Sequence, residues 1–145
     1  MKKLIMVIMA AFAFFSCESS NPKLVEFSQL PANAQSIIKT HFADKVISTI
    51  FYENDLFDKD YEVRFEDGSK IDFDGNGEWT NIEVKKNGGV PVGVIPSAIN
   101  SYVSSKHPNH YVIDIEKDCR EYNVELNNGI DMVFGKNGNF KHYDD

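Results

Sequence analysis

The chain repeats itself, and this repeat constrains the fold more than any other feature of its 145 residues. Two segments, 27–42 (FSQLPANAQSIIKTHF) and 95–108 (IPSAINSYVSSKHP), carry core-type side chains at the same offsets of 0, 4, 7, 8 and 12. Those offsets fall on one face of a helix, and Pro31 and Pro96 suit a first helical turn. The matched positions are Leu30, Ala34, Ile37, Ile38 and Phe42, then Ile95, Ile99, Tyr102, Val103 and His107. The sequence therefore predicts two copies of one helix, 65 residues apart.

Each predicted helix is followed by strand patterns separated by turns with glycine. Apolar and polar residues alternate in 61–66, 70–73 and 79–84, and the pattern returns 61 residues later in the second copy. The change in shift from 65 to 61 places a longer loop near 54–60 in the first copy. One more strand is expected before that loop, at 46–52, and its counterpart at 111–116.

These patterns predict an α+β fold, a tandem repeat in which each unit has a helix and three or four antiparallel strands. A unit of about 60 residues has a thin core, so we expect the two units to join their strands in one sheet. The first repeat is 27–84 and the second is 94–145, with 85–93 (KKNGGVPVG) as the linker.

The first segment has the pattern of an export signal. Met1 to Lys3 is a short positive region, twelve apolar residues follow, and Ser16 precedes Cys17. Twelve residues suit the apolar part of a signal peptide and are too few to span a bilayer. The pattern predicts a signal peptide at 1–16, lipidation of Cys17 and a polar tether at 17–26; plain secretory cleavage is the alternative. Either route exports the protein, and we expect it in the periplasm or cell envelope, on the membrane only through a lipid on Cys17.

The charge balance indicates which partners to expect. The chain has 15 Lys and Arg against 22 Asp and Glu, a net charge of −7, which disfavours nucleic acid and favours a basic partner. After cleavage Cys119 would be the one thiol outside the lipidation position, and we expect it to be a buried small apolar side chain.

The repeated helix openings, LPANAQSIIKTHF and IPSAINSYVSSKHP, together with the hairpins YEVRFEDGSKIDFDGNGEW and YNVELNNGIDMVFGKNGNF, resemble the exported PepSY-like family of Bacteroidetes. This family is also called β-lactamase-inhibitor-protein-like, or BLIP-like, and the resemblance covers about residues 27–143. It implies one curved antiparallel sheet with the helices on its convex face. It also implies a role in binding or inhibiting other proteins through the concave face. The second copy ends soon after Phe140, so we expect a short last strand.

One motif has the spacing of a calcium loop. Asp72, Asp74, Asn76 and Glu83 occupy positions 1, 3, 5 and 12 of the pattern D-x-[DN]-x-[DN]-G-x5-E. A calcium loop of this type lies between helices, whereas this segment lies between strand patterns. We therefore favour a hairpin, with calcium as the possible cofactor and the alternative reading.

Other chemistry has little support in the sequence. His107 and His110 are spaced as H-x-x-H, which we interpret as a half-buried helix end rather than a metal site. The sequence has no nucleophile-elbow, phosphate-loop or zinc-protease motif, so we predict a non-enzymatic protein.

A binding face is the better prospect. If the apolar residues of each strand face the helices, the opposite face is polar and acidic, and it would attract a basic exported protein. Aromatic side chains are the usual anchors of such contacts, although core packing is the alternative for each of them. The candidate partner-binding residues are Tyr52, Glu62, Arg64, Glu66, Trp79, Glu125, Asp131 and Phe140.

Overall fold

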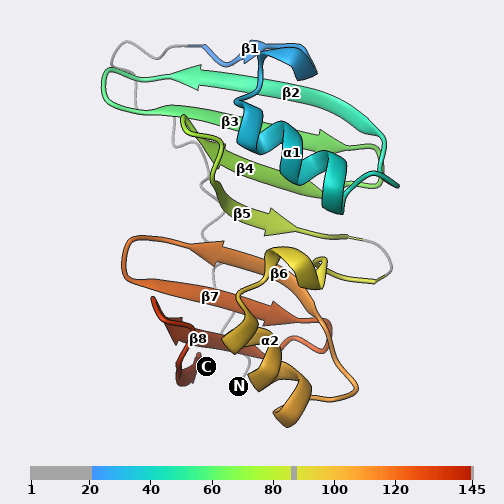
Figure 1. Cartoon of the computed structure of the whole chain (residues 1–145), viewed down its shortest axis with the longest axis vertical. Coiled ribbons are helices and arrows are strands. Elements are labelled where there is room, and N and C mark those ends of the chain that lie inside the picture. The colour runs from blue at the N-terminus through green and yellow to red at the C-terminus, as the bar shows by residue number, and fades with distance from the viewer. Residues whose placement is uncertain (1–20, 86–87, 145) are drawn as a thin grey trace.

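The computed structural model describes residues 21–85 and 88–144, and in this part of the chain it places nine strands in one antiparallel sheet (Figure 1). The strands follow chain order across the sheet, from β1 at one edge to β9 at the other. They are β1 (Lys23–Leu24), β2 (Ile47–Asn54), β3 (Lys59–Phe65), β4 (Lys70–Asp74), β5 (Trp79–Glu83), β6 (Val112–Lys117), β7 (Glu121–Leu126), β8 (Asp131–Gly135) and β9 (Phe140–Asp144). The predicted α+β class and the single antiparallel sheet are confirmed.

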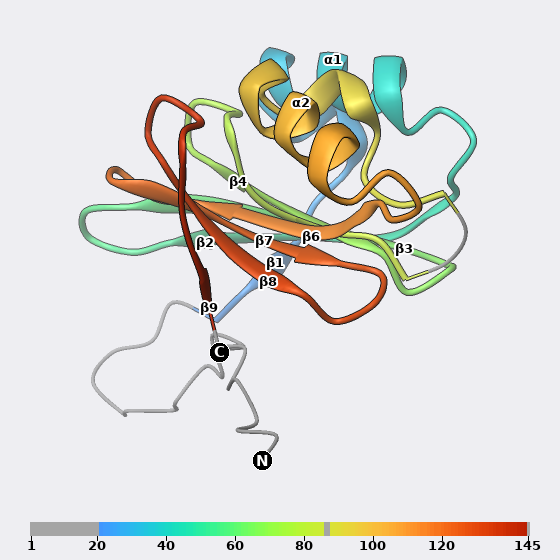
Figure 2. The ribbon, with the colours of Figure 1, turned by 90° about the horizontal axis from the view of Figure 1, so that it is seen from below.

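Two helices lie on the same side of this sheet (Figure 2). They are α1 (Ala32–His41) and α2 (Ser97–Lys106), and each follows a short 3₁₀ turn, η1 (Phe27–Gln29) or η2 (Val92–Val94). Pro31 and Pro96 stand at the two N-caps with φ of −53° and −51°, values that suit a helix start. Both helices lie where the repeated pattern predicts them. Within the described residues, neither helix is long and apolar enough to cross a membrane.

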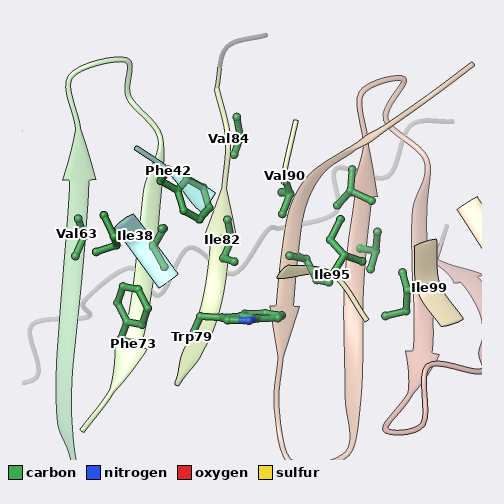
Figure 3. Close-up of a cluster of buried hydrophobic side chains, with 14 of the residues drawn as sticks. Ile38, Phe42, Val63, Phe73, Trp79, Ile82, Val84, Val90, Ile95 and Ile99 are labelled. Atoms are coloured by element: carbon green, nitrogen blue, oxygen red, sulfur yellow. The ribbon is translucent and has the colours of Figure 1, made fainter. Parts of the chain in front are cut away.

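The hydrophobic core lies between the helices and the sheet (Figure 3). Ala34, Ile38 and Phe42 of the first helical pattern are at most 5% exposed, and they pack with strand residues such as Val63 and Ile82. Ile99 and Val103 do the same in the second half. The period of 3.6 in the helices and of two in the strands thus brings both sets of apolar side chains to the same layer.

The two halves of the sheet join at β5 and β6. Ile82 pairs with Ile115 and Glu83 pairs with Asp114. Beyond the strand ends, the Val84 amide donates a hydrogen bond to the Ile113 carbonyl, at 2.8 Å. One core cluster therefore includes buried residues from both halves.

Two equivalent turns fit beneath the two helix starts. Gly77 and Gly138 have φ of +79° and +77°, a conformation that glycine adopts without steric cost. A Cβ atom on Gly77 would lie 2.8 Å from the Ala34 nitrogen, and a Cβ atom on Gly138 would lie 2.8 Å from the Ala98 Cβ. These glycines are explained by close packing of each turn against its helix.

The structure differs from expectation in a few places. Cys119 is exposed, so the expected burial is wrong: it lies in the turn between β6 and β7, where the flanking charged residues face water. Strand β1, which the sequence pattern did not predict, pairs with β2 at the sheet edge. The last strand, β9, has five residues, as does β5. The predicted signal peptide and Cys17 lie outside the described residues.

Candidate functional site

The face of the sheet that points away from the helices is the candidate site, and we call it the open face. Buried strand residues such as Val63, Ile71 and Val124 point toward the helices, so their chain neighbours point to the open face. This alternation puts polar side chains from β2 to β9 on one surface. Within the described residues, both helices lie on the opposite side (Figure 2).

Five carboxylates form a continuous line across the open face. The strand register places Glu83 opposite Asp114, Asp114 opposite Glu125, Glu125 opposite Asp131, and Asp131 opposite Asp144. Neighbouring strands are about 4.8 Å apart, so this acidic row crosses β5 to β9 in about 19 Å. Like charges placed directly opposite destabilise a sheet, so the row is not explained by the stability of the fold.

The same row of the sheet is basic at its other end. Arg64 of β3 lies opposite Lys70 of β4, and Lys70 lies opposite Glu83. These cations are engaged locally, since Arg64 forms an ion pair with Glu62 and the Lys70 Nζ lies 3.2 Å from Asp72 Oδ2. The open face therefore has a neutralised end near β3 and β4 and an acidic end from β5 to β9.

Most of the acidic row lacks a cationic partner. Glu83 forms an ion pair with Lys85, whereas Asp114, Glu125, Asp131 and Asp144 form no ion pair with any described residue. Asp114 accepts a hydrogen bond of 3.2 Å from the Asn81 side-chain amide, which is the partner it has in the described residues.

The electrostatics of Asp114 and Asp131 reflect this crowding. Burial, and then the charges of Glu83 and Glu125, raises the pKa of Asp114 to about 7 from its ordinary value of 3.8. Burial, and then the charges of Glu125 and Asp144, raises the pKa of Asp131 to about 6. Both carboxyls hold a negative charge less readily than usual, and a nearby positive charge would reverse this effect.

Comparison with known proteins now places this fold. The PepSY-like family model, described as "Putative beta-lactamase-inhibitor-like, PepSY-like", matches residues 17–63 and 59–142. The chain belongs to this PepSY-like family. Among curated proteins, none matches the chain.

Solved structures of similar proteins come from Bacteroides species. A crystal structure named as a "putative periplasmic protein" of the DUF2874 family from Bacteroides vulgatus is 38% identical, with a TM-score of 0.82. The match covers 88% of this chain and 100% of that one. A "putative calcium-regulated periplasmic protein" from Bacteroides thetaiotaomicron is 36% identical over 86% of this chain and 97% of its own, with a TM-score of 0.80. A third, a "putative periplasmic protein of unknown function" from Bacteroides vulgatus, is 32% identical over 86% of this chain and 99% of its own, with a TM-score of 0.77.

In this PepSY-like protein, the predicted partner-binding residues fall into two groups. Glu62, Arg64, Glu125 and Asp131 lie on the open face. Glu66 is exposed, but it lies in the turn after β3 and not on the sheet.

The three aromatic candidates share the side of the sheet that the helices cover. Trp79 is 7% exposed and belongs to the core, and Phe140 stacks on Tyr102 of α2 with ring centroids 4.4 Å apart. Tyr52 contacts Tyr61, a residue that packs against the core, with ring centroids 4.9 Å apart. These side chains are therefore placed for packing rather than for contact across the open face.

The four residues of the calcium motif are spread along a hairpin. Asp74 Oδ1 accepts hydrogen bonds of 2.9 Å from the backbone nitrogens of Asn76 and Glu78, so it shapes the turn between β4 and β5. Glu83 lies opposite Lys70, at the end of the hairpin remote from that turn. The hairpin is confirmed. No group of three or more His, Cys, Asp or Glu side chains is placed to hold a metal ion anywhere in residues 21–85 and 88–144.

The histidine pair takes the structural role expected of it. His107 is the C-cap residue of α2 and is half-buried. Its Nε2 atom lies 3.2 Å from the Tyr143 hydroxyl, which links the helix end to the last strand. His110 lies in the loop that follows.

Sequence reasoning found two members of the acidic row as partner-binding candidates, Glu125 and Asp131. It treated Glu83 as a calcium ligand and did not select Asp114 or Asp144. The alternation within each strand indicates which face an acid occupies. The pairing of β5 with β6, however, decides which acids are neighbours, and the alternation does not reveal it.

Proposed function

We propose that this protein is an exported, non-enzymatic binding module that holds a basic protein against the acidic end of its open face. The observation that carries the proposal is the acidic row, in which four of five carboxylates form no ion pair with described residues. A partner bearing Lys or Arg side chains would supply the missing charges and favour the ionised forms of Asp114 and Asp131.

The family description supports this class of function. The matching family is described as beta-lactamase-inhibitor-like, and an inhibitor acts by binding another protein. We extend the proposal to inhibition: the module would act on an exported enzyme by covering part of its surface. A basic target would approach faster because the acidic end attracts it, and salt would weaken this attraction.

We propose the periplasm as the compartment, with a lipid on Cys17 as the anchor. The names of the three similar Bacteroides structures support the compartment, since each is called periplasmic. The apolar segment followed by Ser16 and Cys17 supports the anchor. Labelling of the full chain with a fatty-acid analogue in cells, lost in the Cys17→Ser variant, is the expected result. An unlabelled wild-type chain would refute the anchor.

We also propose that residues 27–84 and 94–145 are copies of one unit, joined by the linker 85–93, with the helices on the convex side of the sheet. The recurrence of a 3₁₀ turn, a helix and four strands in both halves supports this proposal. The matched positions of Gly77 and Gly138 beneath the two helix starts support it as well.

The binding proposal is tested by charge-neutral variants of the acidic row. Residues 18–145 carrying both Glu125→Gln and Asp131→Asn keep the size of each side chain while removing two negative charges. We expect this double variant to lose at least about tenfold in affinity for a partner captured from periplasmic extract and then purified. Glu66→Gln is the matched control, because it removes an exposed carboxylate that lies off the open face. Equal affinity of the double variant and the control would refute the proposal.

Calcium binding is the second candidate function. It is favoured by the name of the Bacteroides thetaiotaomicron relative, and the candidate ligands are Asp72, Asp74, Asn76 and Glu83. A thermal unfolding midpoint that rises by several degrees in calcium, and does not rise in Asp74→Ala, is the result that would support it. No rise at millimolar calcium would reject it.

A further inference from the structure

The hairpin formed by β2 and β3 is longer than its counterpart in the second half. It runs from Ile47 to Phe65, 19 residues, whereas β6 and β7 run from Val112 to Leu126, 15 residues. Its tip forms the left end of the molecule in Figure 2, where it is coloured teal to green. The Asp55 amide donates a hydrogen bond of 2.8 Å to the Asp58 carbonyl, which closes the four-residue loop 55–58.

Two large apolar side chains stand at this tip with almost no protein around them. Leu56 is 92% exposed and Phe57 is 93% exposed, the two highest values among the exposed large hydrophobic residues of the described chain. Neither belongs to the core or to the residues packed against it. Folding therefore gives no reason for these side chains, whereas a buried aromatic or aliphatic anchor is the usual centre of a protein interface.

The surroundings of the tip are acidic. Residues 53–60 contain four carboxylates and one lysine. Burial, and then the charges of Asp58, Asp74 and Asp55, raises the pKa of Asp60, which shows that these carboxylates lie close enough to repel one another. The pKa of Glu53 is raised as well, by burial and then by Asp60 and Asp55. An apolar pair in this setting fits a pocket with positive charges at its rim.

The charge also argues against a lipid surface as the occupant. Membrane-binding apolar tips are flanked by Lys and Arg, because bilayer surfaces carry negative charge. Here the flanking residues Asp55 and Asp58 would be repelled. The tip is also continuous with the open face, since Glu53 pairs with Asp60 and Asp60 pairs with Asp74 across β2, β3 and β4.

We propose that Leu56 and Phe57 form an insertion anchor, which enters an apolar pocket rimmed by Lys or Arg side chains on the partner protein. This proposal rests on the proposed function, because it assigns a second contact to the same protein partner. The acidic row attracts and orients the basic partner, and the tip supplies the apolar contact that the open face lacks.

The test uses the full chain in its own cells, with the photo-crosslinking residue p-benzoylphenylalanine introduced at Phe57. The matched position is Val92, which is 71% exposed but lies in η2 on the helix side. We expect one protein adduct from position 57 and none from position 92. The crosslinked peptide of that protein should lie in an apolar concavity flanked by Lys or Arg. Crosslinking to phospholipid, to a second copy of this chain or to an acidic surface would overturn the anchor.

Purified variants then separate the anchor from the acidic row. Phe57→Ser should weaken binding of the crosslinked protein by about 30-fold and Val92→Ser by less than about twofold, with unfolding midpoints unchanged for both. If the Glu125→Gln and Asp131→Asn double variant loses binding while Phe57→Ser keeps it, the anchor fails and the proposed function stands. If Phe57→Ser alone loses binding, the anchor stands and the acidic row fails. If neither variant changes binding, both proposals fail.

Discussion

Asp114 on β6 lies directly opposite Glu125 on β7, so two carboxylates share one cross-strand position at the centre of the acidic row. Glu83 flanks Asp114 from the other side. A sheet tolerates such an arrangement at a cost in stability. In this protein the cost falls on the same side chains that the proposed function uses to bind a basic partner, which leads to predictions for both stability and binding.

The first prediction concerns the pH dependence of stability. The pKa of Asp114 is raised to about 7 in the folded protein, mainly by burial and then by Glu83 and Glu125. Because the folded state holds the proton more tightly than the unfolded state, the free energy of unfolding falls as pH rises from about 4 to 7. Asp114→Asn keeps an acceptor for the Asn81 amide and removes the charge. It should raise the free energy of unfolding at pH 8 by on the order of 2 kcal/mol and leave it unchanged at pH 4. Urea unfolding at both pH values checks this, and an equal effect at both would contradict it.

The second prediction concerns an ion pair that acts in the opposite direction. Burial raises the pKa of Asp67, but hydrogen bonds from Lys45 and Ser69 outweigh it and lower the pKa to about 2. Stability from this pair is therefore fully present above pH 4 and is lost as pH falls toward 2. Lys45→Met should lower the free energy of unfolding at pH 7 by about 1 kcal/mol, a value reduced by solvent screening. Acid titration of both proteins should show the difference shrinking between pH 4 and 2; a difference that persists at pH 2 would count against this assignment.

The third prediction separates backbone strain from crowding at the glycine turns. Gly77 and Gly129 both have positive φ, +79° and +81°. A Cβ atom on Gly77 meets Ala34 and Pro31 at 2.8 Å, whereas one on Gly129 meets nothing within 4 Å. Gly129→Ala should cost about 1 kcal/mol from its dihedral angle alone, and Gly77→Ala about 1–3 kcal/mol more. Equal losses in chemical unfolding would show that the contact beneath α1 does not matter.

The fourth prediction concerns Trp79. Its side chain is 7% exposed, and the Lys117 Nζ lies 4.4 Å from its ring centroid. Trp79→Ala should therefore lower the free energy of unfolding by about 3–5 kcal/mol, as expected for a large aromatic residue lost from a core. Hydrogen exchange of the core amides would show this loss. An unchanged free energy of unfolding would place Trp79 outside the core.

The sequence predicts the local parts of this fold well. The helical offsets around Ile38 and Val103 and the alternation around Val63 and Val124 are periodic, so α1, α2 and the strands lie close to their expected ranges. The single sheet follows from the thin core of each unit. Strand β1 has only two residues, too few for any periodicity to be visible.

The candidate site could be predicted only in part. Glu125 and Asp131 are assigned to the open face by alternation, but Glu83 and Asp114 become neighbours only through a contact between residues distant in sequence. The turn position of Glu66 depends on where β3 ends, which a pattern locates to within about two residues. The exposure of Cys119 follows from its position in the turn between β6 and β7, which its residue type does not reveal.

The central claim is that the acidic row binds a basic polypeptide. The most direct test is an NMR titration of ¹⁵N-labelled residues 18–145 with a lysine-rich peptide at low salt, repeated at pH 5.5 and pH 8. We predict amide shift changes concentrated in β5 to β9, tighter binding at pH 8 because Asp114 and Asp131 lose their protons, and loss of these changes in the Glu125→Gln and Asp131→Asn double variant. Shift changes spread evenly over the surface, or equal in the double variant, would contradict the claim.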